Sequence, residues 1–163
     1  MSNIKKYYWL IPLIGGIISL IGFLIPAWYS PPVWIEYVWM IGIIHHVTGG
    51  NVIDIAPPEM FIPSLIATLL ISLCSILAIL NALFKFRGKT LLRNTDKLWL
   101  IIAIVEIGAA VFYIFGIQIG FFLNTDLEFV DYYVFQFGLF IPFIGAVLIL
   151  TGSIMGKLTK KDK

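Results

Sequence analysis

Glu106 is the residue of this 163-residue chain whose position most directly suggests chemistry, because it is the only Asp, Glu, Lys or Arg in the apolar run 98–123. Ionisable groups are costly inside a membrane and often mark a path for protons or ions. No other long apolar run contains a charged residue, so a proton relay would have to continue through hydroxyl groups such as those of Ser19, Thr68 or Tyr113. Two interpretations are open. Glu106 is either a buried carboxyl, protonated or hydrogen-bonded to a neighbouring helix, or a transport residue.

His45 and His46 are the other residues that could do chemistry, since Asp54 and Glu59 follow them in the chain. Imidazole and carboxylate groups together can hold zinc or copper. Adjacent residues on a strand point to opposite faces, so only one of the two histidines could join a shared site there. We therefore expect no metal and no cofactor, and His45 and His46 remain the only candidate ligands.

Catalytic residues are not indicated by the remaining sequence. Cys74 is the only cysteine and lies in the middle of an apolar run, which excludes an internal disulfide and a cysteine metal cluster and favours a packing role. The chain has no Gly-rich phosphate loop and no recognisable set of nucleophile, base and orienting residue. We expect the protein not to be an enzyme.

The elements that position these residues are predicted from hydropathy. Apolar residues make up 60% of the chain and charged residues 12%, and the mean hydropathy is +0.99, values far outside the soluble globular range. About 20 apolar residues are needed for a helix to cross a membrane. Four runs meet this length, and the predicted fold is an all-α membrane protein, one domain of residues 1–163. The predicted spans are residues 7–29, 60–84, 98–123 and 132–156.

The charges predict how the four-helix bundle is oriented. All 11 Lys and Arg lie before the first span, in the loop 85–97 or after the last span. Basic residues near membrane spans are retained on the cytoplasmic side. We therefore expect a multi-pass protein of the cell membrane, with both termini and this loop in the cytoplasm. The loops 30–59 and 124–131 are then the outer loops, and their only charged residues are Asp and Glu. The basic residues determine topology and favour anionic lipids, so membrane lipids are expected partners and nucleic acid is not.

The first outer loop is predicted to form a small extracellular β-sheet. Its segment Val33–Thr48 is dense in Val, Ile, Trp and Tyr, and residues 49–51 supply turn chemistry before Val52–Ile55. This pattern is typical of a hairpin. Phe129 and Val130 of the second outer loop are expected to add an edge strand.

Small residues recur at helical spacing along the spans. Since helices in membranes associate through close packing of small residues, these stripes indicate the contact faces. They are interpreted as the seams of one four-helix bundle, or alternatively as a face for self-association or for a partner. The glycines of the last two spans that we single out are Gly116, Gly120, Gly138, Gly145 and Gly152.

The layout of four spans, inner termini, a large first outer loop and a short second one resembles the claudin and peripheral-myelin-protein tetraspan superfamily. Pro26 and Trp28 match the end of that family's first helix, and Trp39, in Tyr-Val-Trp, partly matches its loop tryptophan. Residues 137–152 are similar to its closing helix, with small and aliphatic residues. The family's two loop cysteines are absent from this chain.

The resemblance implies a non-enzymatic role in adhesion, in lateral assembly or as an auxiliary subunit of a membrane complex, with other membrane proteins or further copies of the chain as partners. The residues expected to anchor the outer sheet to the membrane are Trp28, Trp34, Tyr37 and Trp39. Two alternatives remain. One is a small transporter or channel component that uses Glu106, and the other is a subunit of a membrane metalloenzyme that uses His45 and His46.

Overall fold

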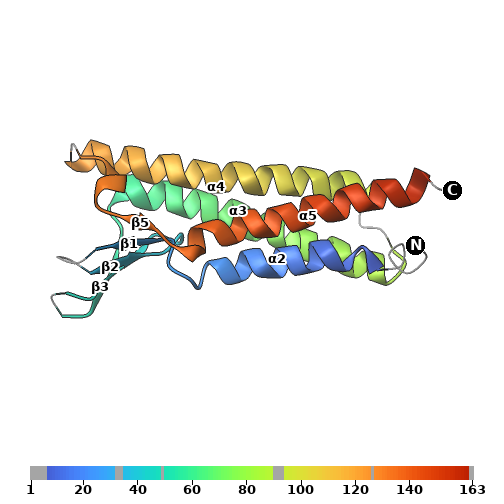
Figure 1. Ribbon diagram of the computed structural model, residues 1–163, viewed down its shortest axis with the longest axis horizontal. Coiled ribbons are helices and arrows are strands. Elements are labelled where there is room, and N and C mark those ends of the chain that lie inside the picture. The colour runs from blue at the N-terminus through green and yellow to red at the C-terminus, as the bar shows by residue number, and fades with distance from the viewer. Residues whose placement is uncertain (1–6, 32–34, 49, 90–93, 126, 162–163) are drawn as a thin grey trace.

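The computed structural model describes residues 7–31, 35–48, 50–89, 94–125 and 127–161. Four helices lie side by side in an elongated molecule, and a small sheet is attached at one end, the sheet end (Figure 1). Both ends of the described chain lie at the opposite end, where the described Lys and Arg also lie, and which we call the basic end. The helices are α2 (Leu10–Gly22), α3 (Pro58–Phe86), α4 (Thr95–Thr125) and α5 (Phe137–Lys161).

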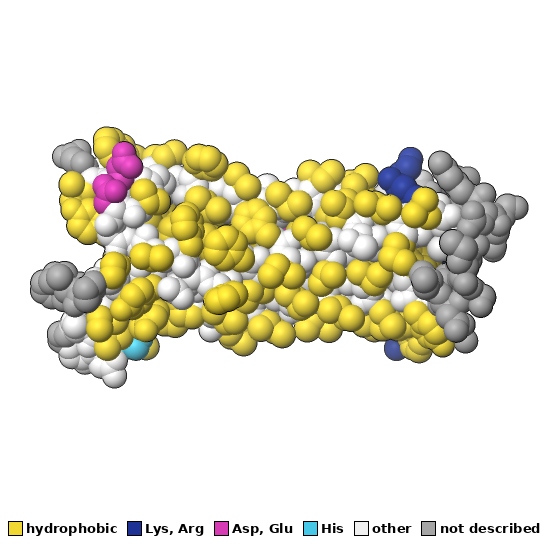
Figure 2. All heavy atoms as spheres, in the orientation of Figure 1, with side chains coloured by type: hydrophobic (Ala, Val, Ile, Leu, Met, Phe, Trp, Pro, Cys, Tyr) yellow, Lys and Arg dark blue, Asp and Glu magenta, His cyan; other side chains and the backbone are white. Residues whose placement is uncertain are grey.

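Three of these helices, α3, α4 and α5, are long and apolar enough to cross a membrane. This finding supports the prediction of a helical membrane protein. With a rise of 1.5 Å per residue, the 29 residues of α3 and the 31 of α4 reach about 45 Å, well beyond a hydrocarbon core of about 30 Å. Hydrophobic side chains cover most of the visible face between the two ends (Figure 2).

Helix α3 shows why the chain forms and ends its helices where it does. Pro58 is the first residue of the helix, a position whose N–H has no partner within the helix, so proline loses no hydrogen bond there. Glu59 in the first turn and Lys85 in the last turn interact favourably with the helix dipole. Gly88 follows the helix with φ +69°, a conformation that glycine adopts without strain. Lys89 N then donates to Phe84 O at 2.9 Å, which satisfies a carbonyl of the last turn.

The first predicted span, residues 7–29, is wrong in its extent. Helix α2 contains 13 residues, about 20 Å, and is the shorter apolar helix of the four. Pro26 cannot donate a helical hydrogen bond, and the chain leaves the helix through a turn before it. Trp28–Ser30 then forms strand β1, because Ala27 N donates to Val38 O and so begins pairing with a neighbouring strand.

The sheet is antiparallel and has five strands in the order β4-β3-β2-β1-β5. The hairpin that the sequence predicts is confirmed: β3 (Ile43–His46) pairs with β4 (Val52–Ile55). Gly50 and Asn51 adopt positive φ in the turn between them. Strand β2 (Glu36–Val38) pairs with both β1 and β3.

The predicted edge strand at Phe129–Val130 is wrong, and so is the start of the fourth span at residue 132. Phe129–Asp131 is a short 3-10 helix, η1, and the edge strand β5 is Val134–Phe135, paired with β1. Phe129 is buried, with its ring edge-on to Trp28 at a centroid distance of 4.8 Å. Burial of this ring therefore takes the place of strand pairing, and α5 begins only at Phe137.

At the sheet end, α3 and α4 extend beyond α2 and α5, and the sheet lies alongside this extension (Figure 1). Trp28, 1% exposed, fills the space between the sheet and the helices. The hydroxyl of Thr68 on α3 donates to the carbonyl of Met40, between β2 and β3, at 2.8 Å. One face of the sheet is thereby fixed against the bundle, and the other face points away from it.

Candidate functional site

The face of the sheet that points away from the bundle carries one continuous row of side chains. Val134, Tyr29, Tyr37, His45 and Ile53 are successive partners across all five strands. Directly opposed residues of an antiparallel pair lie on the same side of a sheet. The Tyr29 and Tyr37 rings are 5.2 Å apart and Ile53 is 68% exposed. We call this row, with Trp39 beside it, the outward sheet face.

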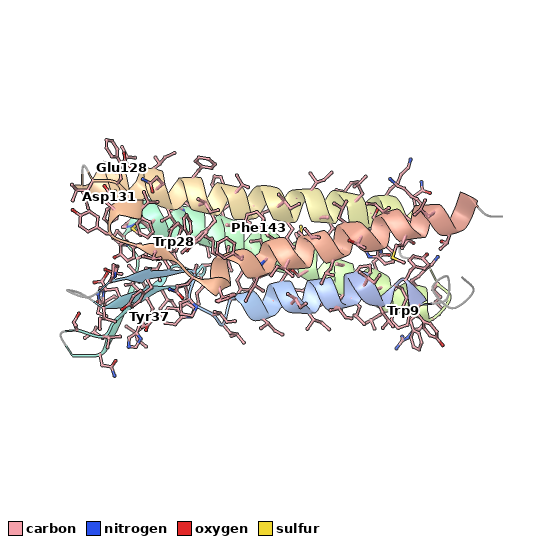
Figure 3. All side chains as sticks on the ribbon, in the orientation of Figure 1. Trp9, Trp28, Tyr37, Glu128, Asp131 and Phe143 are labelled. Carbon is pink, nitrogen blue, oxygen red and sulfur yellow. The ribbon has the colours of Figure 1, made fainter. Side chains whose placement is uncertain are left out.

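The predicted anchors divide between the two faces. Tyr37 and Trp39 belong to the outward sheet face, and their ring centroids are 6.2 Å apart. Trp28 lies instead between the sheet and the helices (Figure 3), so it attaches the sheet to the bundle. Trp34 lies outside the described residues.

An apolar groove of about 280 Å³ joins the outward sheet face to the end of α2. Trp39 Nε1 donates to Leu24 O at 3.4 Å and so connects the sheet to the turn that follows α2. The groove continues an exposed apolar stripe of α2, and it is lined by Phe23, Leu24, Trp39, Ile41, Ile43, His45 and Ile53.

The two adjacent histidines point to opposite faces, as the strand geometry requires. His45 Nε2 is 2.8 Å from Asn51 Oδ1, whereas His46 contacts Glu36 and Asp54. Within the described residues, no group of three or more His, Cys, Asp and Glu side chains is arranged to hold a metal ion. The two candidate ligands therefore do not share a site.

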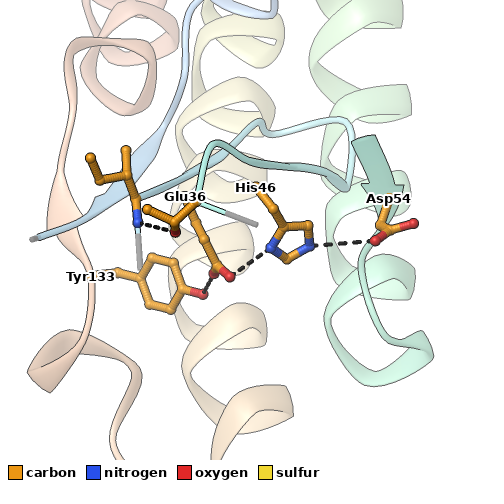
Figure 4. A network of polar contacts seen from close by, with 6 residues as sticks. Glu36, His46, Asp54 and Tyr133 are labelled. Carbon is orange, nitrogen blue, oxygen red and sulfur yellow. Dashed lines mark hydrogen bonds and ion pairs between the residues drawn. The ribbon is translucent and has the colours of Figure 1, made fainter. Parts of the chain in front are cut away.

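His46 belongs to a chain of polar contacts on the face toward the bundle, which we call the Glu36 network (Figure 4). The hydroxyl of Tyr133 donates to Glu36 Oε2 at 2.5 Å. His46 Nδ1 lies 2.6 Å from Glu36 Oε1, and His46 Nε2 lies 3.6 Å from Asp54 Oδ2. An ionised carboxylate only accepts hydrogen bonds, so Nδ1 of His46 is the donor to Glu36.

Tyr133 connects β2 with the segment that precedes α5, 97 residues further along the chain. Burial raises the pKa of the Tyr133 hydroxyl, and its hydrogen bond to Glu36 and the charge of that carboxylate raise the pKa further. The hydroxyl therefore stays protonated and continues to donate at all ordinary pH values.

The Glu36 network forms one wall of a cavity of about 360 Å³ between the sheet and the ends of α3 and α4, which we call the sheet cavity. This volume lies in the range of small-molecule sites. The opposite wall is apolar and includes an aromatic ring. The lining residues are Glu36, Ile44, His46, Asp54, Ile55, Pro57, Met60, Phe121 and Tyr133.

Glu106 lies on α4 in the middle of the bundle and is fully buried. Its Oε1 accepts a hydrogen bond of 3.4 Å from the Ser75 hydroxyl on α3, a contact with a neighbouring helix of the kind that the sequence suggested. The hydroxyl of Ser19, on α2, also lies beside this carboxyl, so both neighbouring hydroxyl groups come from other helices. Thr68 does not continue a chain of hydrogen bonds from this carboxyl, because its hydroxyl donates to Met40 O.

No model of a known protein family matches this chain, and a search of curated proteins found no match.

The five glycines singled out from the sequence all lie at contacts within the chain. On α4, a methyl group at Gly116 would meet Pro63, and one at Gly120 would meet the backbone of Glu59, both on α3. On α5, Gly138 faces the Pro26 carbonyl, Gly145 faces Ser19 and Gly152 faces Pro12. These close approaches support the interpretation of the small residues as seams of the bundle.

Sequence reasoning did not find the Glu36 network or the sheet cavity. One signal for Glu36 is present in the sequence of β2. Side chains alternate between the two faces of a strand, so Glu36, two residues before the buried Val38, lies on the same face as Val38. Nothing in the sequence pairs it with Tyr133, since the contact depends on how the segment before α5 returns to the sheet.

Proposed function

We propose that this chain crosses the cell membrane four times, with both termini in the cytoplasm and the sheet outside. The separation of charge along the molecule supports this topology: the described Lys and Arg gather at one end, and Glu128 and Asp131 lie at the other (Figure 3). The turns that flank α2 lengthen the first apolar segment, since Ile25 N donates to Gly22 O at one end and Ile11 N to Tyr8 O at the other. Residues 8–25 then supply the first crossing.

The function that we propose is that of a non-enzymatic interaction protein, claudin-like in layout, which assembles laterally with copies of itself or joins a membrane complex as an auxiliary subunit. The outward sheet face carries this proposal, because it presents aromatic and aliphatic side chains in a row across every strand and no described element covers it. Aromatic residues of this kind are enriched in protein interfaces. The five glycines singled out above are occupied by contacts within the bundle, so they do not form a free face for a partner.

Cysteine cross-linking in native membranes tests this function, and the chain suits it because Cys74 is the only native cysteine and is buried. In a Cys74→Ser background, Ile53→Cys places a thiol on the outward sheet face. Val130→Cys is the matched control, since it is also exposed at the sheet end but lies in η1, off the sheet. We expect a self-adduct or a partner adduct at position 53 only. Equal products at both positions, or none at position 53, would contradict the proposal.

A second function, transport of protons or ions, is favoured by one observation: Glu106 is fully buried in the middle of the bundle. The test is proton or ion flux in liposomes that contain the purified protein. We expect Glu106→Gln to abolish this flux. Glu59→Gln is the control, since it changes an exposed carboxylate in the first turn of α3, and it should leave the flux unchanged. Absence of flux with the parent protein removes this function.

A further inference from the structure

The sheet cavity has two chemically different walls. Glu36, His46 and Tyr133 form a polar wall in which the hydrogen bonds are 2.5 to 2.6 Å long. Met60 and Phe121 belong to the apolar wall, from α3 and α4. A cavity that combines apolar surface with a few convergent polar groups is the usual form of a small-molecule site.

The polar wall has a charge that the protein does not balance. It contains two carboxylates, of Glu36 and Asp54, so even with a protonated His46 its net charge is negative. The sequence contains no Lys or Arg between Lys6 and Lys85 or between Lys97 and Lys157, and these intervals include every lining residue. An anionic ligand would be repelled, and a cationic one would be attracted.

Glu36 is also positioned to accept a further hydrogen bond. Its side chain is only 17% exposed, and each carboxylate oxygen has one partner, which holds the group in a single orientation. An ionised carboxylate offers about four acceptor positions, so about two remain for a donor in the cavity. Asp54, with a side chain 62% exposed, lies where the cavity opens.

The apolar wall indicates a ligand with an apolar part and not a bare inorganic cation. Phe121 and Tyr133 present aromatic rings, which attract cations, and Met60 presents an aliphatic thioether. A neutral apolar molecule would remove water from Glu36 without replacing its hydrogen bonds, which is unfavourable. From these observations we propose that the sheet cavity binds a small organic ammonium ion, with its N–H groups donating to Glu36 and its apolar body against Met60 and Phe121.

The test uses the full-length protein in mild detergent and n-butylammonium chloride as the probe, followed by isothermal titration calorimetry. The uncharged isostere n-butanol is the ligand control. We expect saturable binding of the ammonium ion and none of the alcohol. Glu36→Gln is expected to weaken binding about tenfold or more, because a charge-assisted hydrogen bond is lost. Glu128→Gln, which removes an exposed carboxylate at the same end, should bind as the parent does.

A second variant keeps the test valid if Glu36→Gln does not fold. Asp54 lines the cavity and its side chain is 62% exposed on the edge strand β4, so Asp54→Asn removes a carboxylate of the cavity without disturbing the core. We expect it also to weaken binding of n-butylammonium. Absence of saturable binding by the parent protein, or equal binding by the parent, Glu36→Gln and Asp54→Asn, would overturn the proposal.

An ammonium group is carried both by free amines and by phosphatidylethanolamine headgroups. Native mass spectrometry of the protein in micelles with equal amounts of phosphatidylethanolamine and phosphatidylglycerol separates the two sources. Selective retention of phosphatidylethanolamine that is lost in Glu36→Gln assigns the site to the lipid headgroup. Binding of n-butylammonium without such retention assigns it to a free amine. The inference would be contradicted if the parent protein neither bound n-butylammonium nor selectively retained phosphatidylethanolamine.

Discussion

Trp28 and Trp39 lie in the same small sheet, yet their environments give them different roles. Trp28 is enclosed by aromatic rings, with the Phe129 centroid at 4.8 Å and the Phe135 centroid at 4.6 Å. Trp39 lies on the opposite face, partly exposed, and contacts the backbone of Leu24. Composition alone gives both residues the same interpretation as membrane anchors, whereas the alternation of strand faces separates them.

Trp28→Ala is therefore expected to destabilise the fold strongly, by about 3 to 5 kcal/mol, since it leaves a cavity where a large aromatic side chain was buried. Trp39→Ala is the control and should cause a clearly smaller loss. Thermal unfolding in detergent, followed by circular dichroism, measures both. An equal change in the unfolding temperature of the two variants would show that Trp28 does not attach the sheet to the bundle.

Tyr133 makes stability depend on pH at the alkaline end. Because burial and Glu36 raise its pKa in the folded protein, its stabilising contribution is complete below the unfolded pKa of about 10 and declines as the pH rises above that value. We expect the unfolding temperature of the parent to fall more steeply above about pH 10 than that of Tyr133→Phe. Tyr132→Phe, an exposed neighbour, is the control and should follow the parent.

The helices illustrate what the sequence can predict at the scale of an element. Hydropathy located α3 and α4 to within about three residues at each end, because charges enclose these apolar runs. It overextended the first span, since Trp28 and Tyr29 are as apolar in a strand as in a helix. The hairpin β3–β4 was predictable from its turn residues, but strand β5 was not. Val134 and Phe135 pair with β1 in a segment that follows the buried Phe129, and this arrangement depends on contacts far apart in the sequence.

Gly145 tests the contact between α2 and α5. A methyl group there would meet the Ser19 hydroxyl and lie 2.7 Å from the Gly15 carbonyl, which cannot move aside easily because it belongs to the backbone. We expect Gly145→Ala to lose about 1 to 3 kcal/mol of stability through overpacking. Gly108→Ala is the matched control, since nothing lies within 4 Å of the added methyl group and alanine favours a helix.

A double variant refines this prediction. Adding Ser19→Ala to Gly145→Ala removes the conflict with the Ser19 hydroxyl but leaves the Gly15 carbonyl and the Cβ of residue 19 in place. Only partial recovery of the unfolding temperature is expected. Full recovery would show that the two helices separate readily, and destabilisation by Gly108→Ala equal to that by Gly145→Ala would mean that the loss is unrelated to packing.

At the scale of the whole molecule, the outward sheet face and the sheet cavity share one end with acidic residues that include Glu36, Glu59 and Glu128, and the described Lys and Arg occupy the other end (Figure 2). The extension of α3 and α4 beyond α2 makes this arrangement possible, because it supports the sheet on one face and leaves the other face open. The outward sheet face and the sheet cavity lie on opposite faces of the same five strands. Variants of Ile53 should therefore alter cross-linking without altering ammonium binding.

The proposed topology is decided at α2, the shortest helix, which must carry the chain from the side of the basic end to the side of the sheet. In a Cys74→Ser background we expect a membrane-impermeant maleimide to label Val52→Cys in intact cells, and Lys89→Cys only after permeabilisation. An epitope tag placed before Met1 should behave as Lys89→Cys does, because α2 is the only described helix between the N-terminus and Val52. Exposure of the tag together with Val52→Cys would mean that α2 lies on the surface and that the chain crosses three times; labelling of both cysteines in intact cells would mean that α3 does not cross.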